Sequence, residues 1–230
     1  MKKMREYDNR KPLLSIHLPK CGGTSFIKVL ETWYAENLFL HYYNEKEGKP
    51  PAKYNLPPGS CVHGHFGGHR GIGADDYYPN IDQRIIIFRD PLEIAVSNYF
   101  FAKRRIEADN NYRDGKRTQN KLLPIEEYLA NEKTFIFSFL PGGIQLTNYA
   151  SILDSHFLFV GVMEQMESTM RCLSTVLGKE YVEIPHTNKS PRSADVSEAA
   201  IQKFRSRNLL AFNVYEYAVN RLESLKSNLS

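Results

Sequence analysis

A short apolar run that leads through a glycine turn into a helix constrains the fold of this chain most. Leu13 to Leu18 are almost uninterruptedly apolar, Gly22 and Gly23 follow, and residues 26–37 have helical spacing. Continuous apolarity predicts a strand that is covered on both faces. We expect the two residues after the glycines, Thr24 and Ser25, to cap the helix. A strand, a turn and a helix in this order predict one unit of a parallel α/β sheet.

The same order occurs again further along the chain. Arg84–Phe88 is a second apolar run, Pro91, which follows Asp90, is suited to a first helical turn, and an apolar stripe follows from Leu92. A third run, His156–Val162, predicts a further strand. The repetition predicts an α/β fold with a central, mainly parallel sheet flanked by helices.

The remaining stretches favour a single domain over residues 1–230. Residues 197–225 predict one or two amphipathic helices that close the core. Residues 43–60 contain four prolines and two glycines, which is typical of a connection. The stretch from about 101 to 150 has a polar, charged first part, and we expect it to leave the sheet as a lid or substrate wall.

Composition narrows the class of protein further. The three cysteines, an odd number and widely spaced, fit neither a disulfide framework nor a zinc site and favour a reducing compartment. No apolar stretch reaches the length of about 18 residues that a membrane span needs. The net charge of +4 does not demand a nucleic-acid partner. These observations predict a cytoplasmic protein without a membrane span or nucleic-acid partner.

The glycine turn predicts an anion site. The first N–H groups of the helix and the positive end of its dipole face one point, and glycine lets an anion approach the backbone. Lys20 adds a full charge, and Thr24 and Ser25 add hydroxyl groups. This lysine precedes the glycines, unlike the lysine of the Walker pattern, so that it can reach the bridging oxygen of a phosphate ester. A turn without a ligand is the alternative reading.

A second phosphate-binding group is predicted at Arg89. This arginine ends an apolar run, at the sheet edge where α/β proteins bind ligands, and its planar fork suits a phosphate. Ser97 lies two turns into the helix that follows. The alternatives are a structural ion pair with Asp90 or Glu93 and an exposed hydroxyl at Ser97.

Two motifs together resemble those of a known family. Pro19–Phe26 resembles the 5′-phosphosulfate loop of sulfotransferases that use 3′-phosphoadenosine 5′-phosphosulfate (PAPS), and Arg89–Leu92 with Ser97 resembles their 3′-phosphate-binding segment. The resemblance extends from about residue 13 to 220 and is closest to the branch with the heparan sulfate and uronyl 2-O-sulfotransferases. It implies a P-loop-like core, PAPS as donor, adenosine 3′,5′-bisphosphate (PAP) as product, and no metal. The implied nucleotide-binding residues are Lys20, Cys21, Gly22, Gly23, Thr24, Ser25, Arg89 and Ser97.

The segment Val62–Phe66 resembles the His-Gly-His strand end that holds the catalytic base of this branch. In an extended segment His63 and His65 point to the same face, and a neutral imidazole can remove a proton from a hydroxyl. We favour His65 as base, with His63 as positioning partner or alternate base. The alternatives are a metal site with His69 as third ligand and ordinary surface histidines. The other four histidines are interpreted as structural: His17, His41, His156 and His186.

A last segment, His186–Arg192, resembles the family's C-terminal loop over the 3′-phosphate and adenine, which assigns nucleotide contacts to Lys189, Ser190 and Arg192. The resemblance implies transfer of a sulfuryl group from PAPS to a hydroxyl-bearing acceptor such as a glycan or small metabolite, with Lys20, His65 and His63 as catalytic residues. Two other functions stay open: a P-loop kinase that uses ATP and magnesium, and a non-enzymatic module that binds polyanions through basic stretches such as residues 103–121.

Overall fold

The computed structural model describes residues 5–44, 47–108, 122–184 and 196–229. Its centre is a sheet of five parallel strands in the order β2-β3-β1-β4-β5. The strands are β1 (Leu13–Ile16), β2 (Leu38–His41), β3 (Cys61–Gly64), β4 (Arg84–Phe88) and β5 (Phe159–Val162). The predicted α/β fold with a parallel sheet flanked by helices is therefore confirmed.

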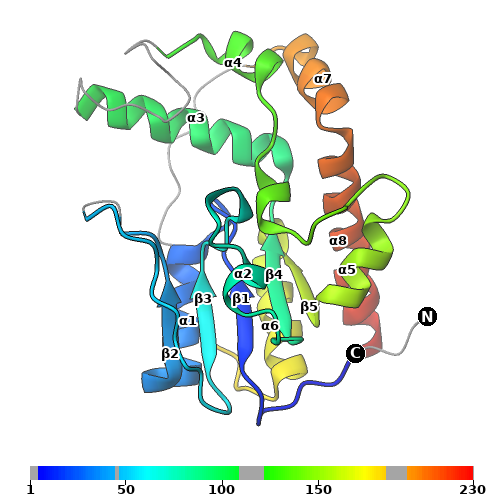
Figure 1. The fold of residues 1–230 in the computed structure, drawn as a ribbon. Coiled ribbons are helices and arrows are strands. Elements are labelled where there is room, and N and C mark those ends of the chain that lie inside the picture. Colours follow the sequence, from blue (N-terminus) through cyan, green and yellow to red (C-terminus); the bar gives the residue numbers. More distant parts are fainter. Residues whose placement is uncertain (1–4, 45–46, 109–121, 185–195, 230) are drawn as a thin grey trace.

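The described helices connect and cover these strands. The α-helices are α1 (Gly23–Tyr34), α2 (Ala74–Tyr77), α3 (Pro91–Ala108), α4 (Ile125–Asn131), α5 (Tyr149–His156), α6 (Met166–Leu177), α7 (Glu198–Arg207) and α8 (Leu209–Leu229). Four short 3-10 turns are η1 (Ala35–Asn37), η2 (Gly68–Arg70), η3 (Ile136–Phe139) and η4 (Met163–Gln165). Figure 1 shows α1 and α6 behind the sheet and α2 in front of it.

The sheet is covered on both faces, as the apolar runs predict. All residues of β1, β3, β4 and β5 are buried, and β2 is the more exposed edge strand. The predicted strand Arg84–Phe88 has the observed bounds. The other two predicted runs are shorter as strands: β1 ends at Ile16, where the chain turns into the loop, and α5 continues through His156, so that β5 begins at Phe159.

Helix α3 is part of a second packed group of helices beyond the ends of the strands (Figure 1). It runs across the edge at which the parallel strands end (Figure 1). Its buried face packs with α4, α7 and α8 in a small apolar cluster separate from the main core. The members are Ala95, Tyr99, Tyr128, Leu129, Phe204 and Phe212. The predicted excursion therefore contains the last turns of α3, α4, η3 and the start of α5, while residues 109–121 lie outside the described part.

Two general features bear on the class of protein. Among the described residues, no helix is both long enough and apolar enough to cross a membrane. The cysteines Cys21, Cys61 and Cys172 are free and buried. They act as small apolar side chains of the core.

Candidate active site

The carboxyl ends of four neighbouring strands bring four side chains to one edge, and two of them, His65 and Arg89, were predicted as site residues. His17 follows β1, Tyr42 follows β2, His65 follows β3 and Arg89 follows β4. Parallel strands end at a common edge, and this edge is where open α/β sheets bind ligands. The site is thus assembled from chain segments that are up to 72 residues apart in sequence, 89 − 17.

The loop after β1 turns into α1 through two left-handed residues. Lys20 and Gly22 are left-handed, with φ of 69° and 77°, and Gly22 is the N-cap of α1. The expectation that Thr24 and Ser25 cap the helix is wrong, because α1 already begins at Gly23 and these residues belong to its first turn. Thr24 is exposed and stands at the positive end of the helix. The first N–H groups of a helix have no partner within it and are available to an anion.

Two side chains of the loop differ in character: Lys20 is charged, and Cys21 is neutral and buried. The Lys20 ammonium lies 4.2 Å from the centre of the Phe101 ring on α3. Burial, followed by the positive charges of Arg104 and Arg89, lowers the pKa of Lys20. An anion at this place would relieve the repulsion among these cations. Cys21 is buried, and burial raises the pKa of its thiol, so the neutral side chain leaves only its backbone for a ligand.

Arg89 links the loop to the beginning of α3. Its side chain is 7% exposed, and Nη1 donates to the Lys20 carbonyl at 2.7 Å. Nη2 donates to Glu93 at 3.2 Å, and Nε lies 3.9 Å from Glu164. The predicted 5′ and 3′ nucleotide segments are therefore in direct contact. The alternative of an ion pair with Glu93 is realised as well, and Ser97 lies half-buried on α3.

Two carboxylates hold the strand ends around Arg89. Asp90 Oδ1 accepts from the backbone N–H groups of Leu92 and Glu93 and thereby caps α3. Glu164, which follows β5, accepts from the Asp90 N–H through one oxygen and from the Tyr215 hydroxyl through the other. This network fixes the ends of β4 and β5 relative to α8. Neither Glu164 nor Tyr215 was predicted as a site residue, because their contact depends on the tertiary fold.

A cluster of three histidines lies beside the loop. The His17 ring stacks on His65, with ring centres 4.3 Å apart, and on His63 at 5.3 Å. The expectation that His63 and His65 point to the same face is confirmed. His17, interpreted as structural from sequence, is in contact with both. The predicted strand Leu13–Leu18 includes His17, whereas the observed β1 ends at Ile16, so no sequence signal placed His17 at the sheet edge with the other site residues.

Hydrogen bonds distinguish the two candidate bases. His65 Nδ1 lies 2.8 Å from the His17 carbonyl, which can only accept, so Nδ1 carries the hydrogen and Nε2 the lone pair. Burial lowers the pKa of His65, which keeps the ring neutral. His63 is 1% exposed, bonds Ser15 Oγ through Nδ1 at 2.9 Å, and has a pKa that burial lowers to about 3. His65 is the more accessible base.

The other histidines do not join the cluster as metal ligands. His41 is fully buried, donates through Nε2 to the Ile72 carbonyl and stacks on Phe66, as a structural residue does. His69 is exposed and lies near Phe139. Within the described ranges, no group of three His, Cys, Asp or Glu side chains could hold a metal ion.

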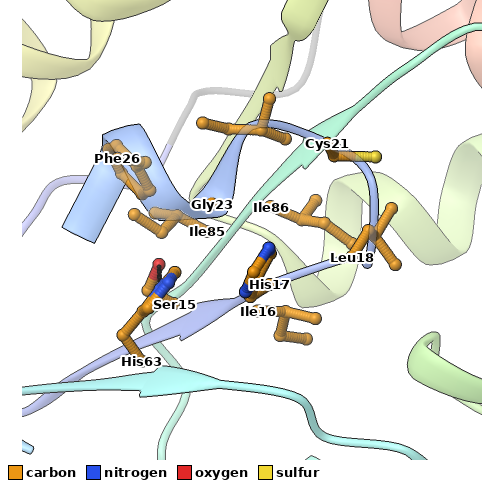
Figure 2. Close-up of a pocket in the computed structure, with 11 residues that line it drawn as sticks. Ser15, Ile16, His17, Leu18, Cys21, Gly23, Phe26, His63, Ile85 and Ile86 are labelled. Carbon is orange, nitrogen blue, oxygen red and sulfur yellow. Dashed lines mark hydrogen bonds between the residues drawn. The ribbon is translucent and has the colours of Figure 1, made fainter. Parts of the chain in front are cut away.

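A small cavity lies beneath the loop and beside the histidines. Its walls include Ser15, His17, Gly23, Phe26 and His63 (Figure 2). With room of about 10 Å³, it holds about one water molecule and is too small for a nucleotide. This cavity is therefore not itself a nucleotide site, and the exposed part of the turn above it is at Thr24.

The chain was compared with protein families, curated proteins and solved structures. No family model and no curated protein matches the sequence. A solved structure that resembles the chain is mouse sulfotransferase SULT7A1 complexed with PAP, with 12% identity and a TM-score of 0.43. The similarity covers 88% of this chain and 65% of that protein, so the chain spans less than two thirds of its length.

The third predicted nucleotide segment lies outside the described residues. It contains Lys189, Ser190 and Arg192, together with His186. The described site therefore consists of the loop after β1, the start of α3 and the histidine cluster.

Proposed function

We propose that this chain is a sulfotransferase that moves a sulfuryl group from PAPS to an acceptor hydroxyl. The observation that carries the proposal is the 2.7 Å hydrogen bond from Arg89 to the Lys20 carbonyl. Through it, the two segments that resemble nucleotide-binding motifs meet at one sheet edge, close enough for a single donor molecule to reach both. The histidine cluster adjoins the same loop.

The fit of this donor is good at its 5′ end. The open N-terminus of α1 and the Lys20 ammonium suit an anionic phosphosulfate. At the 3′ end Arg89 is already paired with Glu93, so a phosphate would have to replace this carboxylate. Ser97, which lies two turns into α3, would be the second residue to bind the 3′-phosphate. On this proposal Lys189, Ser190 and Arg192 complete the nucleotide site.

The reaction needs a base and a positive environment for the leaving group. The acceptor oxygen bonds to sulfur while the bond from sulfur to the bridging phosphate oxygen breaks, leaving PAP with that electron pair. His65 Nε2 takes the acceptor proton, since its Nδ1 hydrogen is committed to the His17 carbonyl. Lys20 and the first N–H groups of α1 stabilise the charge that grows on the phosphate. No residue of this scheme requires a metal.

The acceptor would bind beside His65. Tyr42 and Phe139 place their rings 4.9 and 6.1 Å from the His65 ring centre. Phe139 belongs to η3, inside the stretch that we expect to form a substrate wall. These aromatic rings suit the apolar face of a sugar or of a small metabolite. A hydroxyl-bearing compound of either class is therefore the acceptor that we propose.

Nucleotide binding tests the proposal directly. We expect PAP to bind more tightly than AMP, which lacks the 3′-phosphate, and more tightly than ADP with magnesium, as measured by calorimetry. Lys20→Ala should weaken PAP binding about 10-fold or more, because a half-buried charge partner of the phosphate is lost. Transfer from labelled PAPS to a panel of hydroxyl acceptors measures the activity itself. Preference for ADP with magnesium would instead support a kinase, and a chain that binds polyanions but neither nucleotide would support the binding module.

The Arg89–Glu93 pair gives a second prediction. Glu93→Gln should tighten PAP binding about 3-fold to 10-fold and leave AMP binding unchanged, because it removes a negative charge that competes with the 3′-phosphate for Arg89. Calorimetry with both nucleotides measures the ratio. Glu167→Gln is the control, since Glu167 also pairs with an arginine four residues away, Arg171, in the reverse order and on the exposed surface of α6. Equal tightening of PAP and AMP would contradict a 3′-phosphate contact at Arg89.

A further inference from the structure

His17 contacts both the loop and the proposed base. Its Nδ1 lies 2.9 Å from the Tyr42 hydroxyl, and its ring stacks on His65 with the two planes 22° apart. Its backbone carbonyl accepts from His65 Nδ1. One residue therefore touches His65 both by its backbone and by its ring. Figure 2 shows its ring in the same pocket as Gly23 and His63.

The space beside Gly23 is filled by the His17 ring. A Cβ atom on residue 23 would lie 1.9 Å from His17 Nε2 and 2.1 Å from its Cε1, far inside contact distance. Gly23 is helical and is not among the glycines with positive φ, so an alanine would meet no backbone obstacle there. Gly22 is different, because its φ of 77° itself favours glycine. The ring of His17 thus explains why residue 23 has no side chain.

We propose that His17 is a positioning residue, whose side chain fixes the position of His65 relative to the beginning of α1. Tyr42 fixes the His17 ring through its hydroxyl, the ring supports His65 by stacking, and its far edge packs on Gly23. A displacement of the loop would move His17, and with it the base. This inference rests on the proposed function for its catalytic consequence, whereas its structural part does not depend on the reaction.

The structural part predicts strong coupling between residues 17 and 23. Gly23→Ala alone should lower Tm by about 5 °C or more and weaken PAP binding at least 10-fold, because the methyl group collides with the ring. In the His17→Ala background the same substitution should have less than a third of this effect on Tm, because the space is then open. If Gly23→Ala is equally damaging in both backgrounds, the proposed contact is wrong.

The positioning part predicts a spectroscopic change at His65. In protein with ¹⁵N-labelled histidine, NMR should show His65 with hydrogen on Nδ1 and a lone pair on Nε2; His65→Asn assigns the signals. Both variants keep the His17 carbonyl that accepts from Nδ1, so Tyr42→Phe and His17→Ala should shift these signals only part of the way towards an average of the two tautomers, because the ring that aligns His65 with this carbonyl is loosened or lost. Tyr43→Phe is the matched control, because it removes a hydroxyl from the next residue, whose partner is the Gly48 carbonyl. Unchanged His65 signals in both site variants would refute the positioning role.

Kinetic measurements test the positioning role of His17 and distinguish its failure from a failure of the proposed function. Tyr42→Phe should lower kcat about 10-fold, with the KM for PAPS within twofold of wild type, because the base is misaligned while the donor still binds. Tyr43→Phe should leave kcat unchanged. If the chain neither binds PAP nor turns over PAPS, the proposed function fails, and the Tm coupling and the NMR signals still decide whether His17 positions His65.

Discussion

His65→Asn is expected to lower kcat for transfer from PAPS by about 10²-fold to 10⁴-fold, the range over which a general base contributes. An asparagine amide can still donate to the His17 carbonyl, but it has no lone pair suited to take the acceptor proton. Binding of PAP should stay within twofold of wild type, because His65 does not belong to the nucleotide segments. Steady-state kinetics and calorimetry measure the two quantities.

His63→Asn is the comparison that decides between the two histidines. His63 is sealed beneath the site and already engaged with Ser15, so its loss should reduce kcat less than the loss of His65. The thermal stability of both variants has to be measured, since His63 is part of the core. A larger fall in kcat for His63→Asn at equal stability would make His63 the base.

The strands were predictable where apolarity is continuous and the flanking residues are clear. Arg84–Phe88 has the predicted bounds because it begins with a charged residue and is followed by an α-helix whose first residue is Pro91. β2 was not predicted, because Leu38–His41 is a half-exposed edge strand directly after a 3-10 turn. The predicted strand at 156–162 was too long, because Phe157 and Leu158, which connect α5 to β5, are apolar and buried like the strand itself.

The sequence motifs predicted residues that lie in the site, but not which of them contact one another. Lys20 and Arg89 stand at the ends of predicted strands, and parallel strands end at one edge, so their proximity followed from the fold class. The bond from Arg89 to the Lys20 carbonyl did not follow, because it needs the left-handed backbone of Lys20. Equally, no local pattern indicates that His17 stacks on a residue 48 positions later.

Acid should destabilise this protein strongly through its buried histidines. Burial lowers the pKa of His17 to about 2, of His63 to about 3 and of His41 to about 4. In the unfolded chain each titrates near 6.5. Between pH 6.5 and about 4 the unfolded state therefore binds more protons than the folded state, and stability is lost as the pH falls. Three such groups would lower the free energy of unfolding by about 5 kcal/mol from pH 7 to pH 5.

Urea denaturation at the two pH values measures this loss. His41→Asn should remove about a third of the pH dependence, even if it also lowers stability at pH 7, because one proton fewer is taken up on unfolding. Ile86→Val is the control: it removes a buried methylene and no ionisable group, so it should cost about 1 kcal/mol at both pH values. A free energy of unfolding that hardly differs between pH 7 and pH 5 would mean that these rings are protonated in the folded state. Burial could not then be what keeps the cluster around His65 neutral, and the argument for a neutral base would lose its physical cause.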